Sequence, residues 1–169
     1  MKSNQRIFIG LGTNLGDRAK NLGNAISKIE MIIGKSVTQS SVYISAPLGF
    51  KADTDFFNQV IAIESDLAPL ELLFELKLIE AQMGRVKTKL SGYESRIIDL
   101  DILDYKGQVY QFENLAIPHN QMDRRDFVLL PIAEIAPDWI HPVSGQSVSQ
   151  LIQQLDSSQN AEKIGVAND

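Results

Sequence analysis

Cysteine is absent from the sequence, so neither disulfide bonds nor thiolate metal sites can form. The chain also lacks an apolar run long enough to span a bilayer, and its N-terminus leads directly into an expected strand instead of a signal peptide. We therefore expect a cytoplasmic protein with no membrane partner.

Two familiar nucleotide-binding motifs are missing as well. The sequence contains no Gly-x-x-x-x-Gly-Lys-Ser/Thr loop, which excludes a P-loop site. The segment Gly10-Leu11-Gly12-Thr13-Asn14-Leu15-Gly16 resembles a dinucleotide fingerprint, but Leu15 stands where the third glycine belongs. If the protein binds a nucleotide, it does so by another arrangement.

Positive charge is scarce, because the 169 residues carry a net charge of −5. An acidic protein is a poor general binder of nucleic acid, which requires many contacts to phosphate. The basic residues nevertheless gather in two places, between Arg85 and Arg96 and at Arg124-Arg125. A local cluster of this kind suits a small polyphosphate better than a duplex.

The apolar pattern predicts one α+β domain over residues 1–156 and a polar tail over 157–169 that we expect to be poorly ordered. Apolar β-branched runs favour strands, and apolar residues at helical spacing favour helices that end at Gly34 and Gly84. The expected order βαββαβ is that of a ferredoxin-like core with added C-terminal short strands and helices. The core strands are predicted at 6–12, 37–44, 57–64 and 96–103, the core helices at 22–33 and 69–83, and the added elements at 108–112, 125–135 and 148–155.

The segment Arg96-Ile97-Ile98-Asp99-Leu100-Asp101-Ile102-Leu103 places two carboxylates two residues apart in an apolar, β-branched run. Such a run is typical of a strand, where side chains alternate between the two faces. Asp99 and Asp101 must therefore share one face, while Leu100 points to the other. Two neighbouring anions on a rigid sheet repel each other, and a divalent cation between them removes that penalty. The pattern predicts a metal site, and Arg96 suggests that phosphate lies beside it.

An acidic pair of this kind also occurs at solvated sheet edges, where charged residues deter pairing with other strands. From the two aspartates alone, the edge and the metal site are about equally plausible. The residues elsewhere in the chain decide between them.

These residues resemble the signature of the 6-hydroxymethyl-7,8-dihydropterin pyrophosphokinase family (2-amino-4-hydroxy-6-hydroxymethyldihydropteridine diphosphokinase), an arginine followed after two residues by Asp-aliphatic-Asp-aliphatic-aliphatic. The resemblance runs from the opening strand to about Leu155. The joint order and spacing of further family landmarks are hard to obtain by chance. These landmarks are Gly12-Thr13-Asn14-Leu15-Gly16, Ala46-Pro47-Leu48-Gly49, Phe56-Phe57-Asn58, Glu80 with Gly84-Arg85-Val86-Lys87, Pro118-His119, Arg125 with Phe127, and Glu134-Ile135-Ala136-Pro137.

The resemblance implies an enzyme of folate biosynthesis that transfers pyrophosphate from ATP to the hydroxymethyl group of 6-hydroxymethyl-7,8-dihydropterin, giving AMP and the pterin diphosphate. It implies a Mg-dependent, monomeric enzyme that binds two Mg²⁺ ions, takes ATP as co-substrate and has no nucleic-acid partner. Phosphoryl transfer depends on alignment and charge neutralisation, which metal ions and arginines provide.

The resemblance also implies a role for particular residues. Phe56 and Phe127 can stack on the flat pterin ring, and Asn58 offers it a donor and an acceptor, although plain core packing is the alternative for both aromatics. The implied catalytic residues are Arg85, Arg96, Asp99 and Asp101, of which the two aspartates are the Mg²⁺ ligands. The implied ATP-binding residues are Glu80, Arg85, Lys87, Arg96, Ile102, His119 and Arg125. The implied pterin-binding residues are Ser45, Ala46, Leu48, Phe56, Asn58, Tyr93 and Phe127.

The polar, basic segment 86–95 is expected to be a mobile loop that closes on ATP. Two other functions remain open. A non-catalytic ferredoxin-like module, such as a ligand sensor or an RNA-binding domain, has the same fold, although an RNA-binding sheet presents aromatic and basic residues rather than aspartates. The other is an enzyme of the same class that acts on a different hydroxylated heterocycle.

Overall fold

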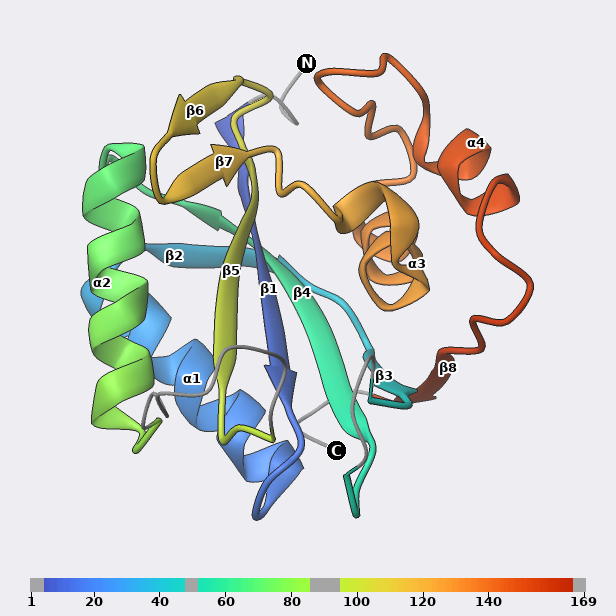
Figure 1. Ribbon diagram of the computed structural model, residues 1–169. Coiled ribbons are helices and arrows are strands. Elements are labelled where there is room, and N and C mark those ends of the chain that lie inside the picture. Colours follow the sequence, from blue (N-terminus) through green and yellow to red (C-terminus); the bar gives the residue numbers. More distant parts are fainter. Residues whose placement is uncertain (1–4, 48–51, 86–94, 166–169) are drawn as a thin grey trace.

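The computed structural model of the protein describes residues 5–47, 52–85 and 95–165. A twisted sheet runs through the middle of the molecule, with helices on both sides (Figure 1). In chain order the elements are β1 (Ile7–Thr13), α1 (Arg18–Ile32), β2 (Lys35–Gln39), β3 (Val42–Ser45), β4 (Phe56–Glu64), α2 (Pro69–Gln82), β5 (Asp99–Tyr105), β6 (Tyr110–Phe112), β7 (Leu115–Ile117), a 3₁₀ turn (Met122–Arg124), α3 (Asp126–Ile135), α4 (Val148–Gln153) and β8 (Glu162–Gly165).

The main sheet has the strand order β5-β1-β4-β3-β8, and β2 also pairs with β4. These pairings are antiparallel. The order confirms the predicted ferredoxin-like core, in which two helix crossovers place β1 and β4 at the centre. Strands β6 and β7 form a separate hairpin.

The single strand predicted at 37–44 is in fact two strands, β2 and β3, that both pair with β4. They are separated at Ser40, whose hydroxyl accepts a hydrogen bond from the backbone nitrogen of Val60 at 3.0 Å. The backbone nitrogen of Ser40 in turn donates to the carbonyl of Val60 at 2.9 Å. A side-chain oxygen thus takes the place of a strand carbonyl, and the ladder is interrupted there.

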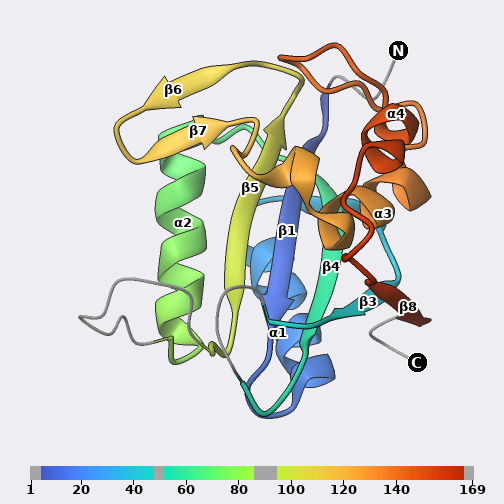
Figure 2. The same ribbon diagram turned by 45° about the vertical axis from the view of Figure 1, so that its right-hand side comes forward.

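Each face of the sheet carries its own layer of helices, with α1 and α2 on one side and α3 and α4 on the other (Figures 1 and 2). The alternation of side chains along β1 explains how one strand serves both layers. Ile7, Ile9 and Leu11 are buried in the core beneath α1 and α2. Phe8 is buried in the second core, beneath α3 and α4. Among the described helices, none has the length and hydrophobicity required to cross a membrane.

The ends of α1 follow from local chemistry. Asp17 caps the start, where its carboxylate accepts a hydrogen bond from the backbone nitrogen of Lys20 at 3.1 Å. The predicted stop at Gly34 is confirmed, and its cause is steric. A Cβ atom at Gly34 would lie 2.0 Å from the carbonyl oxygen of Glu64, so only glycine lets the chain pass the end of β4.

The tail that was expected to be poorly ordered contains β8, so this prediction is wrong for Glu162–Gly165, which pairs with β3. The segment before β8 is fixed on the start of α3. Asp126 Oδ2 accepts a hydrogen bond from the backbone nitrogen of Ala161 at 2.6 Å, and the backbone nitrogen of Asp126 donates to Gln159 Oε1 at 2.8 Å. The edge of β3 offers backbone groups for pairing, which a polar segment satisfies as well as an apolar one.

Candidate active site

A pocket opens on the sheet face that carries α3, where β1 ends and where β4 and β5 begin. It encloses about 750 Å³ of space, part of which is open to solvent. Two groups of predicted site residues line it together, although they come from distant parts of the sequence. The polar group is Arg96, Asp99, Asp101, His119 and Arg125, and the group predicted for the pterin is Ser45, Ala46, Phe56, Asn58 and Phe127.

The floor of the pocket is formed by two glycines of β1. In the sheet register, Gly10 lies opposite Asp101, and Gly12 lies between Asp99 on β5 and Asn58 on β4. Because Gly12 has no side chain, the carboxylates on one side of β1 face the same cavity as the amide on the other. Above Gly10 the space is taken by the side chain of Leu103, which lies 3.3 Å from where a Cβ would be.

Asp99 and Asp101 both face this pocket, which confirms the alternation predicted from the sequence. Leu100, between them, is fully buried in the core on the opposite face. Burial, together with the nearby charge of Asp99, raises the pKa of Asp101 to about 7. The pair is therefore electrostatically unfavourable when both carboxylates are ionised and no cation is near.

A divalent metal ion fits this donor set. Hard cations such as Mg²⁺ prefer carboxylate oxygens, and the ion would remove the repulsion between Asp99 and Asp101. Within the described ranges, no group of three or more His, Asp or Glu side chains is arranged to hold a metal ion. The two aspartates would thus supply only part of a coordination shell, and phosphate oxygens and water would have to complete it.

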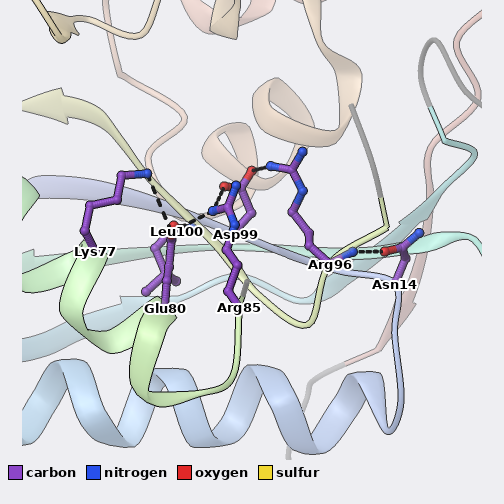
Figure 3. A network of polar contacts seen from close by, with 7 residues as sticks. All are labelled: Asn14, Lys77, Glu80, Arg85, Arg96, Asp99 and Leu100. Carbon is purple, nitrogen blue, oxygen red and sulfur yellow. Dashed lines mark hydrogen bonds and ion pairs between the residues drawn. The ribbon is translucent and has the colours of Figure 1, made fainter. Parts of the chain in front are cut away.

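Two arginines converge on Asp99 (Figure 3). Arg85 Nη1 lies 2.9 Å from Asp99 Oδ1, and Arg96 Nη1 lies 3.2 Å from Asp99 Oδ2. Burial lowers the pKa of Arg85, but the charges of Asp99 and Glu80 outweigh it, and the net shift is upward. Both guanidinium groups stand beside the acidic pair, where the resemblance expected contacts to phosphate.

Glu80 stands behind the site and does not line the pocket. Its side chain is only 3% exposed, and its Oε1 accepts a hydrogen bond from the backbone nitrogen of Leu100 at 2.9 Å. Its Oε2 lies 2.6 Å from Arg85 Nη1 and 3.6 Å from Lys77 Nζ (Figure 3). Glu80 thus joins α2 to β5 and holds Arg85, a role that was not predicted from the sequence, where Glu80 was expected to bind ATP.

The backbone conformation of Gly84 places Arg85 next to Glu80. Its φ of +92° is a conformation that favours glycine, and it ends α2 as predicted from the sequence. The backbone nitrogen of Arg85 then donates to the carbonyl of Glu80 at 3.1 Å, so backbone and side chain of the two residues are both joined. Ile102 lies elsewhere: its side chain is buried in the core beneath α1 and α2 and does not line the pocket.

Asn14 is a site residue that the sequence reading missed, because it was recognised only as part of a glycine-rich landmark. Its Oδ1 accepts a hydrogen bond from the backbone nitrogen of Arg96 at 2.8 Å (Figure 3). Its own backbone nitrogen donates to the carbonyl of Arg96 at 3.1 Å. Its Nδ2 also donates to Ser95 Oγ at 3.0 Å. Asn14 is buried and fixes the backbone that carries Arg96.

The pterin side of the pocket is organised by Asn58, which is also buried. Its Nδ2 donates to Ser45 Oγ at 2.7 Å and to the carbonyl of Tyr43 at 3.3 Å, which ties β4 to β3. Phe56 precedes it on β4, and Phe127 approaches from α3, so aromatic rings come from two separate elements.

His119 and Arg125 complete the wall near α3. Burial lowers the pKa of His119, and the charge of Arg125 lowers it further, which favours the neutral imidazole at pH 7. The guanidinium carbon of Arg125 lies 5.7 Å from the centroid of the Phe127 ring, within the range of a cation–π contact. The predicted site residues Leu48, Lys87 and Tyr93 lie outside the described residues, as does nearly all of the loop expected to close on ATP.

The site combines a pair of carboxylates, two arginines bonded to one of them, and a pocket with aromatic walls on a ferredoxin-like sheet. These features define an α+β enzyme that acts on a phosphate-bearing substrate. Residues 8–137 match the family of 7,8-dihydro-6-hydroxymethylpterin-pyrophosphokinase (HPPK), and the chain belongs to this family. The prediction of the family, and of the pyrophosphoryl transfer for which it is named, is confirmed.

Relatives of two kinds support this assignment. The chain is 42% identical over 149 residues to the 2-amino-4-hydroxy-6-hydroxymethyldihydropteridine pyrophosphokinase of Haemophilus influenzae, covering 88% of this chain and 91% of the relative. It is 40% identical over 149 residues to the protein of the same name from Synechocystis sp., covering 88% and 75%. It is also 40% identical over 152 residues to the Folic acid synthesis protein fol1 of Pneumocystis carinii, but there the match covers 90% of this chain and only 20% of the longer relative.

Solved structures agree at the level of the fold. The chain is similar to the Plasmodium falciparum HPPK-DHPS crystallised with pteroate, with a TM-score of 0.73 and 18% sequence identity. The alignment covers 88% of this chain and 42% of that one. A second HPPK-DHPS structure, solved in complex with substrates, gives a TM-score of 0.70 at 15% identity, with 88% and 43% covered.

Proposed function

We propose that the chain transfers pyrophosphate from ATP to the hydroxymethyl group of 6-hydroxymethyl-7,8-dihydropterin, giving AMP and the pterin diphosphate. The observation that carries this proposal is the convergence of Asp99, Asp101 and Arg96 on one side of a pocket whose other side holds Asn58 and aromatic rings. The chain acts as a monomer on these two small molecules and depends on Mg²⁺.

In this reaction the hydroxyl oxygen of the pterin attacks the β-phosphorus of ATP and releases its proton to solvent. The bond from that phosphorus to the oxygen bridging the α- and β-phosphoryl groups breaks, and AMP leaves with the bridging oxygen and its negative charge. Arg85 and Arg96 neutralise phosphate oxygens as this charge develops, a task that suits the planar guanidinium group. Asp99 and Asp101 would hold two Mg²⁺ ions, which when bound would supply charge neutralisation and acidify the attacking hydroxyl.

The chain's own residues align the two substrates. Phe56 and Phe127 bind the flat faces of the pterin, and Asn58 reads its amide edge. The Oδ1 of Asn58 lies on the side of Gly12, because a Cβ built on that glycine would be 3.5 Å from it. Ser45 holds the other end of the Asn58 amide at 2.7 Å and thereby fixes which way it faces.

The remaining residues implied by the family complete the two binding sites. His119, Arg125 and Lys87 contact ATP, whereas Ala46, Leu48 and Tyr93 contact the pterin. Ile102 meets ATP through its backbone, since its side chain is in the core. Glu80 acts through Arg85, to which it is bonded.

The decisive experiment mixes the purified protein with Mg²⁺, ATP and 6-hydroxymethyl-7,8-dihydropterin and separates the nucleotides. AMP in equal amount to the pterin diphosphate is the expected result, because only pyrophosphoryl transfer releases AMP with that stoichiometry. ADP would instead indicate ordinary phosphoryl transfer. No nucleotide product would favour the non-catalytic binding module.

A panel of other hydroxylated heterocycles, tested at equal concentration, distinguishes the remaining alternative. The pterin should give the highest kcat/KM, and replacing Asn58 with Ala should remove most of that preference. A variant with Ala at an exposed position away from the pocket, such as Lys35, is the matched control. A heterocycle that is turned over faster than the pterin would contradict the proposed substrate while leaving the reaction type intact.

A further inference from the structure

Both oxygens of the Asp99 carboxylate are engaged by arginine. Arg85 Nη1 lies 2.9 Å from Oδ1, and Arg96 Nη1 lies 3.2 Å from Oδ2 (Figure 3). The three side chains are 17%, 14% and 25% exposed, in the order Arg85, Arg96, Asp99, so solvent screens these ion pairs less than pairs on an open surface.

This arrangement conflicts with the requirements of catalysis. The proposed function, on which this inference rests, needs the same carboxylate for Mg²⁺ and the same guanidinium groups for phosphate. A Mg²⁺ ion approaches its oxygen ligands to about 2.0–2.1 Å, and two guanidinium groups on those oxygens would repel it. The carboxylate cannot serve the arginines and the metal ion in the same way at once.

We propose that Arg85 and Arg96 hold the metal position on Asp99 until Mg²⁺ and ATP are both present, and that they then exchange Asp99 for phosphate oxygens. Each charged group keeps a partner of opposite sign in both states. Asp99 passes from two guanidinium groups to a metal ion, and the guanidinium groups pass from a carboxylate to phosphate. No partly buried charge is left unpaired, which would be costly.

The structure supplies a second attachment for each arginine, so that neither depends on Asp99 for its place. Arg85 Nη1 is also 2.6 Å from Glu80 Oε2, whose side chain is buried and bonded to the backbone of Leu100. Arg96 is held at its backbone by Asn14, through hydrogen bonds of 2.8 and 3.1 Å. On leaving Asp99, each guanidinium group therefore has only to turn within the site.

The exchange predicts that replacing either arginine has opposite effects on the binding of a free divalent cation and on the binding of a metal–nucleotide complex. Without nucleotide, a divalent cation has to displace the arginines from Asp99, so removing an arginine should strengthen cation binding. With nucleotide, the arginines bind phosphate, so the same substitution should weaken binding of the metal–nucleotide complex. A purely structural role for the arginines would weaken both, and a role confined to phosphate would leave cation binding unchanged.

The first arm of the test measures Mn²⁺ binding to the nucleotide-free protein from the electron paramagnetic resonance signal of the free ion. Arg85→Gln and Arg96→Gln should each bind Mn²⁺ about five-fold more tightly than the wild type, the factor that corresponds to losing a competing ion pair worth about 1 kcal/mol. Adding Asp99→Asn to either variant should abolish the gain.

Lys77→Gln is the matched control. Lys77 is a cation close to the same carboxylates, since its charge acts on Asp101, but its bonded partner is Glu80 and not Asp99. A gain caused only by removing a nearby positive charge would appear in Lys77→Gln as well as in the arginine variants. A gain confined to Arg85→Gln and Arg96→Gln supports the exchange.

The second arm measures binding of Mg²⁺ with a non-hydrolysable ATP analogue by calorimetry. Both arginine variants should bind this complex about ten-fold more weakly, since each loses a charge-assisted contact to phosphate. Thermal unfolding of each variant verifies that it is folded.

The exchange is overturned if both arginine variants bind Mn²⁺ no more tightly than the wild type, or if neither binds it detectably. It is also overturned if Lys77→Gln gains as much Mn²⁺ affinity as the arginine variants. None of these results involves the pterin or turnover. An enzyme that fails to release AMP refutes the proposed function separately.

Discussion

The two faces of the central sheet are built differently, although they share the same strands. On the face covered by α1 and α2, β1 and β5 present Ile9, Leu11, Leu100 and Ile102, which are buried in a continuous apolar core. On the face of α3, the same strands present glycines and the two aspartates to a pocket. Adjacent residues of one strand therefore have separate tasks.

This difference shows how the protein keeps an electrostatically unfavourable site in a stable fold. The closed face supplies apolar burial, which contributes about 1.5–3 kcal/mol for each large side chain. The open face carries the carboxylate pair, the arginines and the glycine floor, which add little apolar burial. A substitution on the closed face should thus affect stability, whereas one at the pocket end of the open face, away from the second core around Phe8, should affect activity.

The largest effect is expected for Asp101→Asn. We predict a loss of turnover of about 1000-fold or more, because the variant removes a charge that would bind Mg²⁺ beside the reacting phosphate. The midpoint of thermal unfolding should stay the same or rise, since a buried like charge beside Asp99 is removed. Chromatographic measurement of AMP release and circular dichroism test the two parts. AMP release within ten-fold of the wild type would be incompatible with the assigned role.

Leu100→Ala is the complementary change on the closed face. Leu100 is fully buried, so the free energy of unfolding should fall by about 3 kcal/mol. Turnover of the folded enzyme should change only a few-fold, because the hydrogen bond to Glu80 uses the backbone nitrogen, which alanine retains. Urea denaturation and AMP release at low temperature separate the two quantities. An activity loss as large as that of Asp101→Asn would show that the faces are not independent.

The alternation that separates the two faces was predictable from the sequence, because it depends only on local geometry. The period of two in the Asp99 segment predicted which side chains share the pocket, and Gly34 and Gly84 marked the helix ends correctly. The family landmarks located the pocket wall at Asn58. In each of these cases the signal lies within a few residues of the feature that it predicts.

Contacts that depend on the tertiary fold were not predictable in this way. Asn14 bonds to Arg96 across 82 positions, and nothing near either residue identifies the other as its partner. The place of Glu80 behind Arg85 depends on how α2 packs on β5. The polar composition of the tail likewise gave no sign of β8, whose partner is the edge of β3.

An intermediate effect is expected for Gly12→Val, which would fill the floor of the open face. The branched side chain would occupy the space between Asp99 and Asn58, so KM for the pterin should rise by about ten-fold, the equivalent of 1.4 kcal/mol. Ile9→Val, on the closed face of the same strand, is the matched control and should lower stability by about 1 kcal/mol with KM unchanged. Steady-state kinetics with both variants measure the two KM values. An unchanged KM in Gly12→Val would contradict the role of Gly12 as the floor of the pterin pocket.

The smallest effect is expected where α3 is joined to the sheet, because this layer is held by polar contacts in addition to apolar ones. Glu134 accepts hydrogen bonds from the backbone nitrogen and hydroxyl of Ser41 at 2.9 and 2.7 Å, and from the hydroxyl of Tyr43 at 2.6 Å. Burial raises the pKa of Glu134, but the bonds from Tyr43 and Ser41 outweigh it, so the net shift is downward.

A lowered pKa in the folded state means that Glu134 stabilises the protein above the pKa of the unfolded chain, and that this contribution is lost as the pH falls through the folded pKa. Glu134→Gln should therefore lower the free energy of unfolding by about 1 kcal/mol at pH 7, and the difference from the wild type should shrink as the pH falls below about 4. Urea denaturation across this pH range measures it. Tyr43→Phe, alone and combined with Glu134→Gln, isolates the bond between the two side chains, and a difference that grows on acidification would reverse the assigned sign.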